Sequence, residues 1–108
     1  MSRFADILAR LAATVEARKG ADAASSYTAK LLAGGPPLAA KKFGEEAIET
    51  ALAAVLGDSD AMAAESADLI YHWLVLLTAT GVSLDAVAAK LEAREGRSGI
   101  EEKASRGS

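Results

Sequence analysis

The stretch KKFGEEAIETALAAVL, residues 41–56, places three carboxylates ahead of a run of apolar residues. These are the carboxylates of Glu45, Glu46 and Glu49, and no basic residue separates them. Within a helix, Glu45 and Glu46 both lie within reach of Glu49, and like charges at this spacing repel one another. Such a group is stable either on a solvated helix face or around a cation that neutralises it.

A second acidic pair, Glu65 and Asp68, follows in ESADLIYHWL, and its members are again three residues apart. At helical spacing this pair shares a stripe with Leu69, His72 and Leu76. Both acids therefore belong to a face that we expect to turn inward.

The apolar stripe of the earlier helix consists of Ile48, Leu52 and Val55, and Glu45 and Glu49 lie on its flank. We expect this stripe to face inward, because the apolar side of a helix packs against a core. Consecutive helices with a short connection pack antiparallel. Along such a hairpin we do not expect the two acidic sets to be level, so a bend, a helix offset or a second copy of the chain must bring them together.

Five ionised carboxylates in partly buried space raise one another's pKa and destabilise the fold. A divalent cation removes this cost, and an all-oxygen donor set suits Mg²⁺ or Mn²⁺ rather than zinc. Mg²⁺ commonly takes its remaining ligands from substrate phosphates and activates water. The chemistry indicated is attack of water on a phosphoanhydride. The alternative is an ordinary solvated helix start, where glutamate favourably meets the helix dipole.

The composition narrows the class of protein. A chain of 108 residues suits one domain, and 51 % apolar residues with only 5 % aromatic residues favour helices. The absence of cysteine excludes disulfides and thiolate metal sites. A net charge of −3 lacks the excess of positive charge that is typical of nucleic-acid-binding proteins. No apolar run reaches the roughly 20 residues of a membrane span. The first residues lack a secretory pattern, so we expect a cytoplasmic protein without a nucleic-acid or membrane partner.

Hydrophobic periodicity and helix-end signals predict an all-α fold with five helices, at about 3–18, 26–32, 36–57, 58–80 and 83–94. We expect one all-α domain over residues 1–95. Residues 96–108 are charged and rich in Gly and Ser, which predicts a flexible C-terminal tail.

The fourth helix is apolar around nearly its whole circumference. The residues concerned are Leu69, Ile70, Trp73, Leu74, Val75, Leu76 and Leu77. Such a helix must be buried on most sides, and a small chain has little material to cover it. We therefore expect a homodimer of intertwined helical hairpins with a four-helix-bundle-like core.

Glu-Glu-x-x-Glu followed by Glu-x-x-Asp resembles the signature of the all-helical MazG-like nucleoside triphosphate pyrophosphohydrolases. Five segments between about Ser26 and Arg106 resemble, in this order, the phosphoribosyl-ATP pyrophosphatase family: SYTAKLLAGG, KKFGEEAIET, ESADLIYHWLVLL, LEAR and SGIEEKASR. The resemblance implies Mg²⁺-dependent hydrolysis of phosphoribosyl-ATP to phosphoribosyl-AMP and pyrophosphate in histidine biosynthesis, with Mn²⁺ as a substitute metal. It also implies a dimer, in agreement with the apolar fourth helix.

By this resemblance the metal ligands are Glu46, Glu49, Glu65 and Asp68. Glu45 matches the first glutamate of the signature, whose role stays open between ligand, support of a ligand and orientation of the attacking water. Glu45 and Glu49 are the candidate catalytic residues. A phosphate-rich substrate needs cations and N–H donors, and the candidates are Lys30, Lys41, Lys42, Arg94, Arg97, Ser98, Lys103 and Arg106.

The phosphate-binding candidates of the tail, Arg97, Ser98, Lys103 and Arg106, are expected to close over the phosphoribosyl end of the substrate. For each basic candidate, the alternative is an ordinary solvated charge on the surface. His72 is interpreted as a core or interface residue rather than a ligand. Tyr71 and Trp73 are interpreted as packing residues, although one aromatic residue near the site could stack on adenine.

Two rival functions stay open. A house-cleaning pyrophosphohydrolase would share the chemistry and act on ordinary or damaged nucleoside triphosphates. A non-catalytic helical oligomer would carry the same acids as a surface feature.

Overall fold

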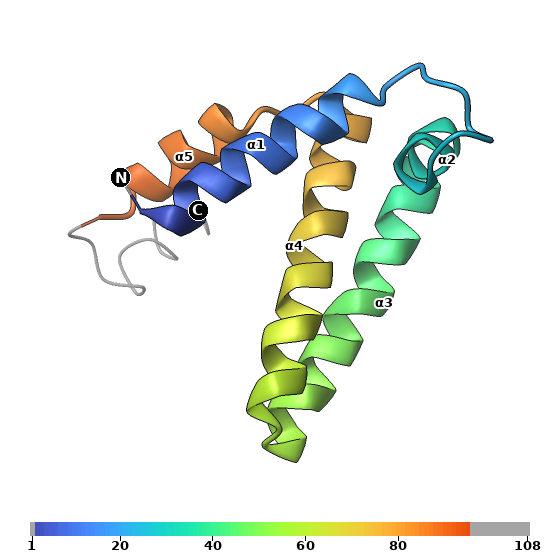
Figure 1. The fold of residues 1–108 in the computed structure, drawn as a ribbon. Helices are drawn as coiled ribbons and strands as arrows, with labels where there is room; N and C mark the ends of the chain where they lie inside the picture. Colours follow the sequence, from blue (N-terminus) through green and yellow to red (C-terminus); the bar gives the residue numbers. More distant parts are fainter. Residues whose placement is uncertain (1, 96–108) are drawn as a thin grey trace, which may run out of the picture.

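The computed structural model describes residues 2–95, which form five helices and no strand (Figure 1). The helices are α1 (Arg3–Ala17), α2 (Tyr27–Ala33), α3 (Gly35–Leu56), α4 (Ser59–Thr80) and α5 (Leu84–Glu92). The predicted all-α class is confirmed, and the expected helices agree closely with those observed. The predicted tail, residues 96–108, lies outside the described part of the chain.

Local sequence signals set most of the helix ends. Serine or aspartate side chains accept a backbone N–H in the first turn of four helices, which satisfies a donor that has no partner inside the helix. These caps are Ser2 for α1, Ser26 for α2, Asp58 for α4 and Ser83 for α5. Gly57 and Gly81 each adopt a φ of 73°, the left-handed conformation that ends α3 and α4.

The two longest helices, α3 and α4, form a hairpin that extends away from α1, α2 and α5 (Figure 1). Their mutual contact is the most extensive between any two helices of residues 2–95. The buried residues of α3 are small, namely Ala39, Thr50 and Ala53. Small side chains on this face allow α4 to approach α3 closely.

The hydrophobic core lies at the end of the hairpin where the shorter helices meet it. Its buried members are Val15 of α1, Leu31 of α2, Ala39 of α3, and Leu74 and Val75 of α4. Partly buried residues such as Trp73 and Leu76 pack around this cluster. The core therefore fixes one end of α3 and α4, and the rest of the hairpin is held by contacts between the two helices themselves.

The prediction that the apolar stripe of α3 faces inward is wrong for the single chain. Ile48, Leu52 and Val55 are 65 %, 56 % and 83 % exposed, and Leu56 beside them is also exposed. The reason is that α4 packs against the small residues of α3, around Thr50, rather than against its large apolar ones. A continuous apolar face along α3 is left uncovered within one chain.

No single helix in residues 2–95 is long and apolar enough to cross a membrane. The helices α4 and α5 meet the criteria of length and composition only when taken together, and they are bent by 108° at the break between them.

Candidate metal centre

Three carboxylates from the two long helices converge midway along the hairpin. Glu46 and Glu49 of α3 and Glu65 of α4 each offer an oxygen atom, and these atoms all lie within 4.8 Å of one another. The expectation that the two acidic sets are not level is therefore wrong. Glu49 and Glu65 stand at nearly equal distances along the chain from the turn at Gly57, so the antiparallel hairpin alone brings them together.

Thr50 joins the backbones of the two helices at this level. Its hydroxyl oxygen lies 2.8 Å from the carbonyl oxygen of Glu46 and 3.2 Å from that of Glu65. The hydroxyl can donate to either carbonyl, and the side chain is buried. Thr50 therefore fixes how the two helices face each other where their carboxylates meet.

Burial and mutual repulsion act on the acids of this cluster. Desolvation raises the pKa of Glu46 and of Glu65, and the neighbouring Glu49 and Asp68 raise both values further. One carboxylate oxygen in each of the two residues, Oε2, is buried without a hydrogen-bond partner. Unpaired buried acceptors of this kind are costly, so the cluster is unfavourable unless protons or a cation neutralise it.

The donor set fits a hard divalent cation. All three converging groups offer carboxylate oxygen, the ligand type that such cations prefer. The two unpaired Oε2 atoms have free lone pairs, and Glu49 is exposed, which leaves one side of the cluster open to solvent. Glu46, Glu49 and Glu65 are thus the residues that could hold a metal.

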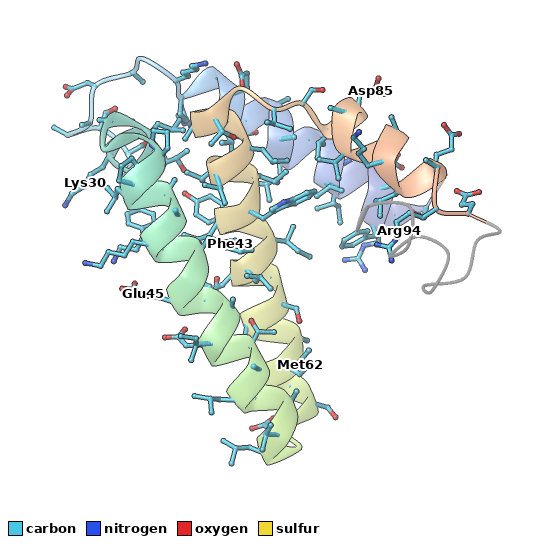
Figure 2. All side chains as sticks on the ribbon, turned by 180° about the vertical axis from the view of Figure 1, so that it is seen from behind. Lys30, Phe43, Glu45, Met62, Asp85 and Arg94 are labelled. Atoms are coloured by element: carbon cyan, nitrogen blue, oxygen red, sulfur yellow. The ribbon has the colours of Figure 1, made fainter. Side chains whose placement is uncertain are left out.

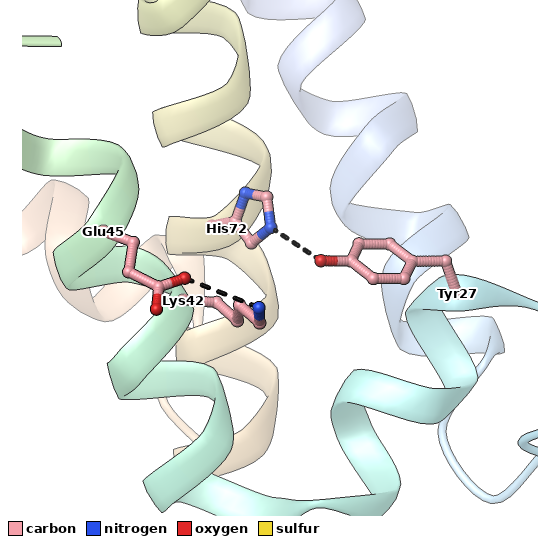
Figure 3. A network of polar contacts seen from close by, with 4 residues as sticks. All are labelled: Tyr27, Lys42, Glu45 and His72. Carbon is pink, nitrogen blue, oxygen red and sulfur yellow. Dashed lines mark hydrogen bonds and ion pairs between the residues drawn. The ribbon is translucent and has the colours of Figure 1, made fainter. Parts of the chain in front are cut away.

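The other two predicted acids lie at the edge of this cluster. Asp68 of α4 is exposed and is not among the three whose oxygens converge, although its charge raises the pKa of Glu46 and Glu65. Glu45 of α3 instead forms an ion pair with Lys42, with 3.5 Å between Nζ and Oε1 (Figure 3). The structure therefore separates Glu45 from the three glutamates that meet.

His72 is buried one helical turn beyond Asp68. Its Nδ1 lies 2.8 Å from the carbonyl oxygen of Asp68, which can only accept, so Nδ1 carries the proton. The other ring nitrogen, Nε2, lies 3.4 Å from the hydroxyl oxygen of Tyr27 (Figure 3). The prediction that His72 is a core residue is confirmed by its burial.

The predicted phosphate-binding residues are distributed unevenly. Lys30 and Lys41 are exposed on α2 and α3, and Lys30 lies on the same side of the molecule as Glu45 (Figure 2). Arg94, just beyond α5, lies far from Glu45 in the same view, so one chain does not bring it to the cluster. The remaining candidates, Arg97, Ser98, Lys103 and Arg106, lie outside the described residues.

Sequence reasoning missed the side chains that tie the elements together. The acid spacing does not indicate Thr50, and it does not indicate the cross-helix partners of Tyr71 and His72, which are Thr28 and Tyr27 of α2. The available signal was the pair of segments SYTAKLLAGG and ESADLIYHWLVLL, which carry these residues. Spacing along one helix does not reveal that two such segments meet.

Known proteins resemble this chain over most of its length. Residues 8–95 match the family described as phosphoribosyl-ATP pyrophosphohydrolase. The phosphoribosyl-ATP pyrophosphatase of Caulobacter vibrioides (strain NA1000 / CB15N) is 72 % identical over 104 residues, which cover 96 % of each chain. The protein of the same name from Caulobacter sp. (strain K31) is 66 % identical over 106 residues, covering 98 % of each chain. That from Parvibaculum lavamentivorans (strain DS-1 / DSM 13023 / NCIMB 13966) is 59 % identical over 107 residues, covering 99 % of this chain and 98 % of the relative. The chain therefore belongs to the phosphoribosyl-ATP pyrophosphohydrolase family.

Proposed function

We propose that this chain hydrolyses phosphoribosyl-ATP between its α and β phosphates and releases phosphoribosyl-AMP and pyrophosphate, the second step of histidine biosynthesis. The observation that carries the proposal is the convergence of Glu46, Glu49 and Glu65 in a chain whose relatives are named for this activity. Oxygen donors gathered in this way suit a cation that takes its remaining ligands from phosphate.

The cation in this proposal is Mg²⁺, with Mn²⁺ as a substitute, and Asp68 joins Glu46, Glu49 and Glu65 as a ligand. When bound, Mg²⁺ supplies charge that neutralises phosphate oxygens and lowers the pKa of water. The unpaired Oε2 atoms of Glu46 and Glu65 support the assignment, because their free lone pairs are buried and available to a cation. Hard cations with near-octahedral geometry prefer such oxygen atoms.

The hydrolytic step forms a bond between a water oxygen and phosphorus and breaks the bridging P–O bond. The electron pair of that bond leaves with pyrophosphate, and the water gives up a proton. We assign the orientation of the water and the acceptance of this proton to Glu45 and Glu49. Glu49 is exposed next to the partly buried Glu46 and Glu65, and Glu45 is exposed one helical turn before it on α3.

Lys30, Lys41 and Lys42 are assigned to the phosphates of the substrate, because ammonium groups donate charge-assisted hydrogen bonds to phosphate oxygens. Lys42 already pairs with Glu45, so substrate must compete with that carboxylate for it. Residues of the tail, Arg97, Ser98, Lys103 and Arg106, are assigned to the phosphoribosyl end. Arg94 takes part only if a second copy of the chain brings it to the cluster.

That second copy is part of the proposal. The exposed apolar face of α3, formed by Ile48, Leu52, Val55 and Leu56, is the surface on which we place it, giving a homodimer with a four-helix-bundle-like core. The same proposal includes a cytoplasmic location and excludes nucleic-acid and membrane partners, in keeping with the net charge of −3.

The test is a substrate panel assayed for pyrophosphate release in Mg²⁺. The proposal predicts turnover of phosphoribosyl-ATP with a kcat/KM far above that of ATP, dUTP or oxidised nucleoside triphosphates. Preference for the ordinary or damaged triphosphates would point to the house-cleaning function. No release from any of them would leave only the non-catalytic helical oligomer.

A further inference from the structure

Two segments far apart in the sequence meet through a double contact between α2 and α4. The hydroxyl of Tyr27 bonds to Nε2 of His72, and the hydroxyl of Thr28 bonds to that of Tyr71. The three rings also contact one another, with Tyr71 and His72 edge to face at a centroid distance of 4.9 Å. The first turn of α2 is therefore fixed against the middle of α4.

Tyr27 is half exposed, although its polar end is bonded. The residue is 53 % exposed, whereas Phe43, Tyr71 and Trp73 are partly buried. The plane of the Tyr27 ring lies 23° from that of Tyr71 at a centroid distance of 6.4 Å, and its edge meets His72 at 6.2 Å. A solvent-facing aromatic ring held in this way offers a preformed apolar surface.

That surface lies beside the acidic cluster. His72, whose Nε2 meets the hydroxyl of Tyr27, donates from Nδ1 to the carbonyl oxygen of Asp68, the acid at the edge of the cluster. In Figure 3 Tyr27 reaches from α2 towards His72, and the pair Lys42–Glu45 of α3 lies on the other side of the imidazole. The other exposed aromatic residue of the described chain, Phe4, stands at the start of α1, far from α2 (Figure 1).

We propose that the Tyr27 ring is a stacking surface for the base of the nucleotide substrate and that His72 is the positioning residue that holds it. The inference rests on the proposed function, since it needs a substrate that carries a base next to its phosphates. Stacking suits such a surface because every base presents a π-face to an aromatic ring. The hydroxyl of Tyr27 is used by His72, so the ring face rather than the phenol makes the contact.

Only one of the two reaction products carries the base, so comparing the affinities for the two products tests the stacking surface directly. Titration calorimetry in Mg²⁺ measures phosphoribosyl-AMP, which carries the base, and pyrophosphate, which lacks it. We expect Tyr27→Ala to lower the affinity for phosphoribosyl-AMP by roughly 5- to 150-fold, the range for loss of one base–aromatic stack. The affinity for pyrophosphate should stay within about twofold, since the carboxylates are untouched. Tyr27→Phe and His72→Leu keep the aromatic ring at position 27 but remove its hydrogen bond to position 72. They should lower the affinity for phosphoribosyl-AMP less than Tyr27→Ala does.

Thr28→Val is the matched control, because it removes the adjacent contact between α2 and α4 and leaves the Tyr27 ring in place. An equal loss of phosphoribosyl-AMP affinity in Thr28→Val and Tyr27→Ala would overturn the inference, because docking of α2 would then explain both. Unchanged affinity in Tyr27→Ala, or equal loss for pyrophosphate, would also overturn it. So would a wild type that binds pyrophosphate but not phosphoribosyl-AMP.

If Tyr27→Ala does not fold, Tyr27→Trp supplies the measurement. Its added fluorescence, compared with that of the wild type, should respond to phosphoribosyl-AMP and not to pyrophosphate; the absence of that difference would contradict the inference. The proposed function has its own readout, release of pyrophosphate from phosphoribosyl-ATP by the wild type. If the wild type turns over phosphoribosyl-ATP normally but the Tyr27 variants do not change the affinity for phosphoribosyl-AMP, the stacking surface is rejected and the proposed function stands.

Discussion

The Thr50 hydroxyl of α3 lies 3.2 Å from the carbonyl oxygen of Glu65 on α4, and 2.8 Å from that of Glu46 on its own helix. This contact is at the level where the carboxylates of Glu46, Glu49 and Glu65 converge. A single buried hydroxyl thus relates the backbones that carry the acids of both helices.

Replacing this hydroxyl should loosen the metal site without unfolding the protein. We expect Thr50→Val, which keeps the shape and removes the donor, to weaken Mn²⁺ binding by about three- to tenfold, a loss comparable to one net hydrogen bond. Thr50→Ser keeps the donor and should bind Mn²⁺ like the wild type. Electron paramagnetic resonance of free Mn²⁺ measures both affinities. Equal Mn²⁺ affinity in all three proteins would show that the contact does not position the acids.

The stability of the metal-free protein should fall as the pH rises. The pKa values of Glu46 and Glu65 are raised in the folded state above their ordinary value of 4.5, so the folded protein binds more protons than the unfolded chain between the two values. This contribution is absent below the ordinary value and reaches its full destabilising size above the folded values. Thermal unfolding in EDTA should therefore give a lower Tm at about pH 8 than at about pH 5.

Two controls identify the acids responsible for that slope. Glu46→Gln and Glu65→Gln should each flatten the dependence of Tm on pH, because neither amide titrates. Added Mg²⁺ should raise the Tm of the wild type more at high pH, where the carboxylates are ionised. A Tm that rises with pH across this range, with the same slope in the wild type and both variants, would be incompatible with a strained acidic cluster.

The exposed face of α3 should control the oligomeric state. Leu52→Lys and Val55→Glu place charges on residues that are 56 % and 83 % exposed in the single chain. We expect either change to convert the dimer to a monomer in sedimentation velocity, because burying an unpaired charge in an interface is costly. Leu91→Lys, on the exposed surface of α5, serves as the control and should remain dimeric. A monomeric wild type at micromolar concentration would refute the assembly.

Removing residues 96–108 tests the proposed role of the tail. The truncated protein should fold with an unchanged Tm, because the buried cluster of Val15, Leu31, Ala39, Leu74 and Val75 is formed by residues that stay in place. We expect KM for phosphoribosyl-ATP to rise or turnover to be lost, since Arg97, Ser98, Lys103 and Arg106 are assigned to the substrate. Kinetic constants equal to those of the full chain would remove these residues from the site.

Most of the fold could be predicted from the sequence, because its signals are local. Serine and aspartate caps, left-handed glycines and the apolar repeat define where the helices begin and end. The packed face of α3 could not be predicted in the same way. Its larger apolar residues, such as Leu52 and Val55, define the strongest stripe, yet α4 packs against Ala53 and Thr50. Because α4 is apolar nearly all round, its own pattern does not select a face.

Only those features of the candidate site that depend on spacing within one helix could be predicted from the sequence. The acid types and their spacing pointed to Glu45, Glu46, Glu49, Glu65 and Asp68, and the structure brings Glu46, Glu49 and Glu65 of these together. Contacts between distant segments, such as Thr50 with Glu65 and Tyr27 with His72, depend on how helices are placed in space. A pattern within a single helix carries no information on such a contact.

Metal-dependent hydrolysis at the acidic cluster is tested most directly by the Mg²⁺-dependent release of pyrophosphate from phosphoribosyl-ATP by the wild type, Glu49→Gln and Asp68→Asn. We predict rapid turnover by the wild type, none in EDTA, and a kcat lower by several orders of magnitude in both variants, because a missing carboxylate disturbs metal and water together. Glu92→Gln, an exposed acid of α5, should match the wild type. Full activity in Glu49→Gln and Asp68→Asn, or activity without any divalent metal, would contradict metal-dependent hydrolysis at the acidic cluster.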